Sequence, residues 1–171
     1  DKYTVDSSAY LKQYTSLAFS PLSANPAIAY YEFLGSGNGR LKYAIWNGAS
    51  WDIEVVDENV GGGGMDICRW ISLAFTPSGN PAIAYHCFTM GILRYAVWGG
   101  SSWDIQTVDT PSITRVGEFV SLTFTPSGYP AIGYYDRSNG DLKYAVLNGA
   151  SWAIRAVDCA GDVGRWASLA F

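Results

Sequence analysis

The 171-residue sequence predicts an all-β protein built from repeated four-stranded antiparallel meanders. Three observations support this fold class: an internal repeat, four short apolar segments in every repeat, and turn-forming residues between these segments. Each observation comes from a different property of the chain, and all three define the same repeating unit.

A Ser-Leu-(Ala/Thr)-Phe segment marks the repeat. Its four copies occupy residues 16–19, 72–75, 121–124 and 168–171. The final phenylalanines of successive copies lie 56, 49 and 47 residues apart. Self-similarity at such a period indicates that each repeat is one supersecondary unit, which buries its apolar surface against its neighbours.

Each unit contains four short apolar segments that are predicted to be strands. In the first unit they are residues 16–19, 26–31, 41–46 and 51–57. Turn residues such as Pro77-Ser78-Gly79-Asn80 separate equivalent segments in the other units. Short apolar runs bounded by Gly, Pro, Asn and Ser are typical of strands in a meander. No stretch keeps a helical period, so almost no helix is expected.

The strands are apolar at both residue parities, as in Ala-Ile-Ala-Tyr-Tyr at residues 27–31. Such strands are buried on both faces. A sheet sandwiched between two other sheets meets that condition. Four such strands in a unit of about 50 residues are typical of a β-propeller blade.

The units resemble the repeats of bacterial β-propellers of the lectin and Asp-box type. The hairpin Asn47-Gly48-Ala49-Ser50-Trp51, repeated at residues 148–152, is similar to the Asp-box turn that joins the third and fourth strands of sialidase-type propeller blades. The Asp-box spaces its acid, Gly and Thr-Trp one residue wider, and Gly99-Gly100 replace Asn-Gly in the second unit. The resemblance implies the fold. A sialidase would also need a cluster of arginines and a Tyr–Glu pair, and the sequence shows no such set.

The predicted domain is residues 1–171, a single propeller-type repeat domain that is part of a larger propeller or assembly. Its segments are a preceding fourth strand and loop (1–15), three units (16–71, 72–120, 121–167) and the start of a fourth unit (168–171). Three blades do not close a ring, because propellers typically have about 4 to 8. Open strand edges favour pairing with other chains. A longer chain, or self-association through residues 1–6 and 167–171, is therefore expected.

Composition excludes several classes of function. The net charge is −4 and the 11 Lys and Arg residues are scattered singly, so nucleic-acid binding is not expected. No apolar run is long enough for a membrane helix, and no signal peptide is visible, so any leader is expected to have been removed. The three cysteines form no CxxC motif, and His86 is the only histidine. No zinc site, other cofactor or catalytic triad is predicted.

Loop lengths vary at one end of the units and are nearly constant at the other. The variable end holds the connections from the second to the third strand and from the fourth strand to the next unit. Loops on a rigid scaffold often carry binding sites. Mere tolerance of insertions explains the variation equally well.

An aromatic residue precedes the first strand of every unit, on the variable end. These residues are Tyr14, Trp70, Phe119 and Trp166, and Arg69 and Arg165 adjoin two of them. They could form a collar on which sugars stack, with the arginines donating hydrogen bonds. Structural plugs between blades are the favoured interpretation, because this is the commoner role of large aromatic side chains.

Two carboxylates, Glu32 and Asp136, end the second strand of the first and third units on the same face. A carboxylate pair could indicate glycoside hydrolysis. However, the middle unit has Cys87 at this position, so a solvated loop position is the favoured interpretation. A second acidic series ends the fourth strand of each unit, and turn formation through side-chain bonds to backbone N–H groups is expected for it. Its members are Asp6, Asp57, Asp109 and Asp158.

Cys68 and Cys87 fall on neighbouring strands of the middle unit and on the same face, so a disulfide between them is predicted. Cys159 is then left over. A disulfide would imply an extracellular setting.

Three functions are compatible with these features. The first is a non-enzymatic structural or self-assembly module, outside the cell or on its surface, in a fibre or array. The alternative is a lectin-like propeller that binds glycans. A sialidase-like glycosidase is the least supported, because the arginines and the carboxylate pattern that it needs are missing.

Overall fold

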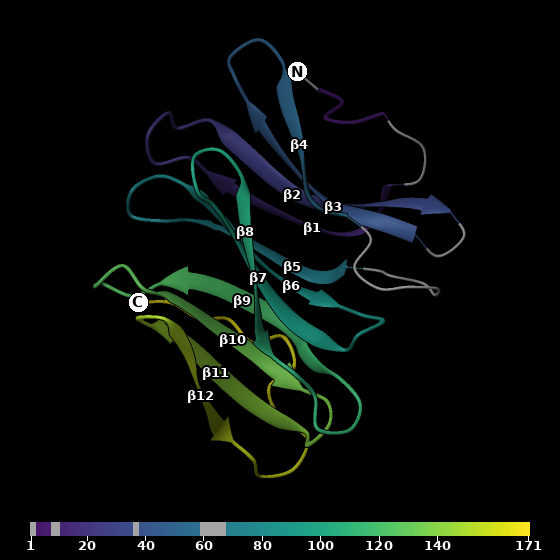
Figure 1. The fold of residues 1–171 in the computed structure, drawn as a ribbon, viewed down its shortest axis with the longest axis vertical. Helices are drawn as coiled ribbons and strands as arrows, with labels where there is room; N and C mark the ends of the chain where they lie inside the picture. Colours follow the sequence, from purple (N-terminus) through teal and green to yellow (C-terminus); the bar gives the residue numbers. More distant parts are fainter. Residues whose placement is uncertain (1–2, 8–10, 36–37, 59–67) are drawn as a thin grey trace.

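The computed structural model describes residues 3–7, 11–35, 38–58 and 68–171. Within these residues the chain forms three four-stranded antiparallel sheets and no helix, which confirms the predicted all-β class. The sheets follow one another along the long axis of the molecule (Figure 1). They do not close into a ring. Each sheet is called a blade below.

Every blade is a meander in which strands adjacent in sequence pair with each other. Blade 1 contains β1 (Leu11–Phe19), β2 (Pro26–Gly35), β3 (Asn38–Trp46) and β4 (Trp51–Glu58). Blade 2 contains β5 (Cys68–Phe75), β6 (Pro81–Cys87), β7 (Ile92–Trp98) and β8 (Trp103–Asp109). Blade 3 contains β9 (Val116–Phe124), β10 (Pro130–Asp136), β11 (Asp141–Asn148) and β12 (Ser151–Asp158). The first strands β1, β5 and β9 contact one another in succession and form one edge of the array.

The hairpin between β3 and β4 shows why the Asn-Gly-Ala-Ser motif recurs. The side-chain Oδ1 of Asn47 accepts hydrogen bonds from the backbone N–H of Ala49 (2.9 Å) and of Ser50 (2.8 Å). Gly48 has φ +102°, a left-handed conformation that favours glycine. The motif therefore builds a tight turn at the end of the blade with constant loop lengths.

The core lies between the blades. One apolar cluster joins blade 1 to blade 2, and a second joins blade 2 to blade 3. All seven residues of β10 are buried, which confirms that central strands are covered on both faces. On the outer face of blade 1, which packs against no other blade of the described chain, the equivalent position is open. Leu17 is 57% exposed, whereas Leu73 and Leu122 at the same repeat position are 6% exposed.

Polar bonds also join the blades, and they correct the expectation for the repeated aspartates. The Oδ2 atom of Asp57 accepts hydrogen bonds from the Tyr85 hydroxyl (2.5 Å) and from Arg94 Nη1 (3.1 Å) of the next blade. Asp109 does the same with Tyr134 and Lys143, at 2.7 and 3.3 Å. Asp57 and Asp109 are therefore ties between blades rather than turn formers, whereas Asp158 accepts from the backbone N–H of Ala160 (2.9 Å), as predicted for a turn. The reason is that the end of the fourth strand packs against the middle of the next sheet.

The two terminal segments are not strands, contrary to the prediction. Described residues 3–7 form no strand ladder, because no third strand lies beside them. Residues 168–171 form none either, because no second strand lies beside them. Residues 1–2 and 8–10 of the predicted first segment lie outside the described residues. Both segments still make the contacts of the repeat. Asp6 accepts from the Tyr30 hydroxyl (2.7 Å) and Lys42 Nζ (2.8 Å). The Leu169 N–H donates to Ser121 Oγ, as the Leu122 N–H does to Ser72 Oγ.

The predicted disulfide between Cys68 and Cys87 is not formed. The two residues are directly opposite each other on β5 and β6, as expected, but both are buried thiols. In blade 3 the same pair of positions is Val116 and Asp136, so the strand pairing does not depend on a covalent bond. Cys159 is an exposed thiol.

The described part of the chain contains no helix long and apolar enough to cross a membrane.

Candidate functional site

The four aromatic residues expected before the first strands belong to one repeat position with an unusual backbone. Tyr14, Trp70 and Phe119 lie inside β1, β5 and β9 rather than before them. Their φ angles are +78°, +47° and +53°, and that of Trp166 is +54°. Left-handed φ is uncommon for bulky residues and costs on the order of 1–3 kcal/mol. An irregularity in the strand pairing accompanies each of the three intrastrand positions.

A β-bulge of this kind redirects a side chain out of the regular alternation of the strand. In blade 3 the bulge begins at Gly117, with φ +92°. A Cβ at this glycine would come within 2.6 Å of the Cβ of Leu93 on the neighbouring blade. The glycine thus permits both the left-handed turn and the close approach of the two blades. The ring of Phe119 is turned toward the edge where the first strands meet.

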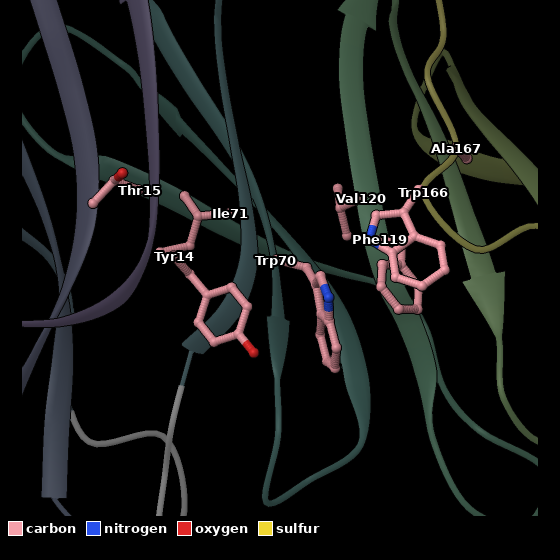
Figure 2. A pocket seen from close by; sticks show the side chains of 8 residues that line it. All are labelled: Tyr14, Thr15, Trp70, Ile71, Phe119, Val120, Trp166 and Ala167. Atoms are coloured by element: carbon pink, nitrogen blue, oxygen red, sulfur yellow. The ribbon is translucent and has the colours of Figure 1, made fainter.

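The aromatic side chains form a continuous row across the three blades (Figure 2). The ring centroids of Tyr14 and Trp70 are 5.6 Å apart, those of Trp70 and Phe119 5.2 Å, and those of Phe119 and Trp166 4.8 Å. All the ring pairs are tilted, with interplanar angles between 46° and 54°. These distances are typical of favourable aromatic pairs.

The row lines an open groove of about 320 Å³, which is called the aromatic groove below. The remaining lining residues are the neighbours of the four rings in sequence: Thr15, Ile71, Val120 and Ala167. Trp166 is 78% exposed, and the other three aromatic residues are partly buried. The rings therefore contact one another and also face a space that another molecule could fill.

The two arginines adjoining this row point elsewhere. Arg165 bonds to Asp162, with 2.7 Å between Nη2 and Oδ2, and its guanidinium lies 5.4 Å from the ring centroid of Tyr135. Arg69 lies over the ring of Phe88, at 3.7 Å from the centroid. Neither arginine lines the aromatic groove.

The carboxylates Glu32 and Asp136 are buried, so the expectation of solvated loop positions is wrong. Each is 2% exposed. Glu32 forms ion pairs with Arg40 (2.5 Å) and Lys42 (2.9 Å), and Asp136 with Lys143 (2.6 Å). Their position inside the blade, next to the lysine of the third strand, removes them from solvent.

The environment of Asp136 also fixes its charge. Burial opposes ionisation of its carboxyl, but hydrogen bonds from Lys143 and Asn139 outweigh burial and lower the pKa below its ordinary value. A carboxylate held in this way is poorly suited to donate or accept a catalytic proton near neutral pH.

Within the described part of the chain, no carboxylate, histidine or cysteine lines the aromatic groove. Among the described residues, no group of three or more His, Cys, Asp and Glu side chains could hold a metal ion. The groove offers aromatic faces with a few hydroxyl and backbone groups, a composition that suits binding.

Sequence reasoning missed a second cluster, next to the groove in blade 2. His86 is fully buried, and burial together with the charges of Arg115 and Arg69 lowers its pKa to about 3. This burial makes His86 a packed residue of β6. One signal was available in the sequence, because His86 replaces the tyrosines found at this position in the other two units. Arg115 and Phe88 lie in loops of the variable end. Phe88 matches Phe33 of the first unit, but the third unit has Arg137 at this position, and Arg115 has no counterpart in the repeat.

His86 is expected to make the fold sensitive to mild acid. Its folded pKa lies below the unfolded value of about 6.5, so its contribution is intact above pH 6.5 and is lost as the pH falls toward 3. In His86→Phe, the loss of unfolding free energy between pH 6.5 and 4 should be smaller by about 1.4 kcal/mol per pH unit. Urea denaturation at several pH values measures this. Parallel stability curves for the two proteins would contradict it.

No protein-family model and no curated protein matches this sequence. Solved structures do share its fold. A protein of unknown function from Dyadobacter fermentans aligns with a TM-score of 0.62 and 11% identity, over 82% of this chain and 40% of that one. This chain thus spans well under half the length of the Dyadobacter protein.

Two further structures have carbohydrate-related functions of their own. A fucose lectin from Kordia zhangzhouensis, in complex with methyl-fucoside, aligns with a TM-score of 0.52 and 16% identity, over 82% of this chain and 96% of that one. An endo-arabinase from Bacteroides thetaiotaomicron aligns with a TM-score of 0.55 and 11% identity, over 91% and 66%. At these identities the similarity concerns the fold: an array of four-stranded antiparallel blades.

Proposed function

We propose that this chain is a non-catalytic, lectin-like module that binds glycans in the aromatic groove. The observation that carries the proposal is the row of four aromatic side chains from one repeat position, which line a single open groove. Sugar rings present apolar C–H faces that stack on aromatic rings, and binding sites are typically lined by aromatic side chains with few polar groups.

The backbone at these positions supports a binding role. Four aromatic residues keep a left-handed φ although glycine would adopt it without cost. Strain of this kind persists where the surrounding structure enforces it and is frequent at ligand sites. The fold supports the proposal as well, since the lectin and the endo-arabinase that share it both act on carbohydrates. The described lining of the groove contains aromatic and aliphatic side chains and no carboxylate pair, which favours binding over hydrolysis.

Loss of the groove tryptophans is expected to abolish glycan binding. A glycan panel would first identify a ligand of the wild-type protein, and titration calorimetry would then measure its affinity for Trp70→Ala and Trp166→Ala. Aromatic anchors of a binding site typically contribute about 2 kcal/mol or more, so a loss of at least about tenfold is expected.

Trp98→Ala is the matched control, because Trp98 ends β7 at the opposite end of blade 2 and packs against Trp103. It should bind glycans with wild-type affinity. Failure of the wild-type protein to bind any glycan, or equal losses in all three variants, would refute the proposal.

We also propose a self-association role, which rests on a separate observation: the outer faces of blades 1 and 3. Val157 is 61% exposed, whereas Val56 and Val108 at the same repeat position are 6% exposed. Leu17 on the opposite outer face shows the same contrast with Leu73. Because the two faces are the two halves of the contact between blades, blade 1 of a second copy of this chain fits blade 3 of the first if it displaces the terminal segments 3–7 and 168–171, which make the same contacts within one chain. Such head-to-tail contacts form rings or filaments.

Val157→Asp is expected to prevent this association. The wild-type protein should show a mass that rises with concentration in light scattering, and the variant should remain monomeric because a buried charge without a partner is costly. Ile113→Asp is the control, since Ile113 is 80% exposed in the loop before β9. A wild-type protein that is monomeric at every accessible concentration would contradict self-association.

A further inference from the structure

Four residues of blade 2 and the loop after it form a cationic cluster beside the aromatic groove. Arg69 on β5 and His86 on β6 are directly opposite each other in the strand pairing, so their side chains share one face of the sheet. Phe88 follows β6, and Arg115 precedes β9. The set Arg69, His86, Phe88 and Arg115 is called the arginine cluster below.

The two guanidinium groups of the cluster stack on the same ring. The Cζ atoms of Arg69 and Arg115 are each 3.7 Å from the ring centroid of Phe88. Two guanidinium groups cannot occupy one face of a ring at that distance, so they lie on opposite faces. Cation–π attraction holds each of them in place. Phe88 thus separates two like charges and keeps them near each other.

Among the described residues, no acidic side chain neutralises this pair of charges. In the described part of the chain, Arg94, Lys143 and Arg165 each have a carboxylate partner, but Arg69 and Arg115 have none. The Nε atom of Arg69 and both imidazole nitrogens of His86 are buried without a hydrogen-bond partner. Buried polar groups are seldom left without one, and such groups call for an explanation, for instance a ligand.

The loop that carries Phe88 is held firmly. The Gly91 N–H donates to the carbonyl of Cys87, and the Val116 N–H donates to the carbonyl of Gly91, both at 2.8 Å. Gly91 has φ +69°, and a Cβ there would come within 2.7 Å of the Thr114 carbonyl oxygen. The two loops that supply Phe88 and Arg115 therefore dock closely, and the cluster is organised before any ligand arrives.

The cluster is continuous with the aromatic groove through Trp70. Arg69 precedes Trp70 in the chain, and the ring centroids of Trp70 and His86 are 5.3 Å apart. A sugar stacked on Trp70 would thus have its substituents within reach of the cluster.

We propose that the arginine cluster is a binding site for the anionic group of an acidic glycan, a carboxylate or a sulfate ester, whose sugar rings occupy the aromatic groove. Guanidinium groups bind such oxyanions with paired, charge-assisted hydrogen bonds. The identification of the carrier as a glycan rests on the function proposed above. The presence of an anion site is independent of that function, because it follows from the geometry of the arginine cluster.

His86 provides a direct measure of anion binding, because it is the only histidine in the sequence. The charges that face it are Arg69 from β5 and Arg115 from the loop before β9, and both lower its pKa. An anion bound to one or both guanidinium groups offsets their field, so the pKa of His86 should rise on binding. NMR of the imidazole during a titration with sodium sulfate, against sodium chloride at equal ionic strength, reports this shift.

If the arginine cluster binds anions, the imidazole signal of His86 should change in a saturable manner with sulfate and should not change with chloride. The change should be lost in Arg69→Gln and Arg115→Gln. It should persist in Arg155→Gln, which removes an exposed arginine on β12. No saturable change in the wild-type protein, or equal changes in all three variants, would overturn the anion site.

Glycan probes then identify the carrier. Affinity for tetragalacturonate is compared with that for its methyl ester, and affinity for sulfated maltotetraose with that for maltotetraose. We expect at least about tenfold tighter binding of one or both acidic forms, abolished in Arg115→Gln. A preference for tetragalacturonate over its methyl ester identifies a carboxylate as the bound group, and a preference for sulfated maltotetraose identifies a sulfate ester.

The two proposals can fail separately. Equal affinity for acidic and neutral glycans, with binding lost in Trp70→Ala, would overturn the present inference and leave glycan binding intact. Sulfate binding at His86 without binding of any glycan would support the anion site and overturn the proposed function.

Discussion

Replacing Asp57 by alanine is expected to lower the free energy of unfolding by about 3 kcal/mol. The carboxylate of Asp57 is the acceptor for two groups of the next blade, the Tyr85 hydroxyl and the Arg94 guanidinium. Tyr85 is fully buried, and the Arg94 side chain is 15% exposed. Removing the carboxylate would leave a largely buried positive charge without its partner, which costs more than the loss of one hydrogen bond.

Asp158→Ala is the matched control, because Asp158 holds the same position in the third unit. It is exposed and bonds only to the backbone N–H of Ala160, at 2.9 Å, among the hydrogen bonds that the structure describes. Its replacement should change the free energy of unfolding by less than about 1 kcal/mol. Urea denaturation of both variants provides the comparison. Equal effects would show that these aspartates serve their own blade and do not join neighbouring blades.

The protein is expected to unfold abruptly in alkali. Burial is the largest cause of a raised pKa in five tyrosines that are at most 4% exposed, and nearby carboxylates raise their pKa further. These residues are Tyr30, Tyr43, Tyr85, Tyr95 and Tyr134. Because their folded pKa values exceed the unfolded value, stability is intact below about pH 10 and is lost as the pH rises above it.

The size of this effect follows from the number of tyrosines. Each hydroxyl that ionises only in the unfolded chain removes about 1.4 kcal/mol per pH unit. Five together exceed a typical domain stability of about 5 to 15 kcal/mol within roughly two pH units. Lys42 and Lys143, whose carboxylate partners raise their pKa against the opposing effect of burial, add to the loss at still higher pH.

Circular dichroism between pH 9 and 12 measures the transition, and Tyr134→Phe tests its origin. That variant loses the hydrogen bond to Asp109 and is therefore less stable at neutral pH. The slope of its stability against pH above 10 should nevertheless be shallower by about 1.4 kcal/mol per unit. An unchanged slope, or a wild-type protein that keeps its stability through pH 12, would contradict the prediction.

Local patterns in the sequence predicted the strands and the meander. The apolar segment at residues 27–31 is buried within β2, and the Asn47 motif forms the expected hairpin. These features depend on residues close together in the chain, so a single repeat contains the information. Strand pairing at the two ends could not be predicted in this way, because a segment becomes a strand only beside a partner strand. Residues 3–7 and 168–171 have no such partner in the described chain.

Contacts between units were harder to predict than contacts within them. The recurrence of the aspartates was visible, but the role of Asp57 and Asp109 was misassigned because a single unit suggests a turn, as Asp158 does form. Their partners recur as well: a tyrosine on the second strand and Lys or Arg on the third, as in Tyr85 and Arg94. Three polar positions kept in every unit could have indicated a bond between units.

The candidate site was predicted only in part. The repeat identified Tyr14, Trp70, Phe119 and Trp166 as one set, and the structure brings them together. Nothing in their sequence signalled the left-handed backbone that turns their rings into the groove. The arginine cluster could not be predicted from the repeat, because Arg115 has no counterpart in the other units and meets Phe88 and Arg69 only in the folded chain.

Fluorine NMR of the protein labelled with 5-fluorotryptophan tests glycan binding in the aromatic groove most directly. Of the seven tryptophans, Trp70 and Trp166 line the groove, and the other five lie near the hairpins that join the third and fourth strands. A ligand chosen from the glycan panel should shift the signals of Trp70 and Trp166 in a saturable manner and leave the five others in place. Shifts confined to the hairpin tryptophans, or none with any glycan, would contradict the assignment of the groove as a binding site.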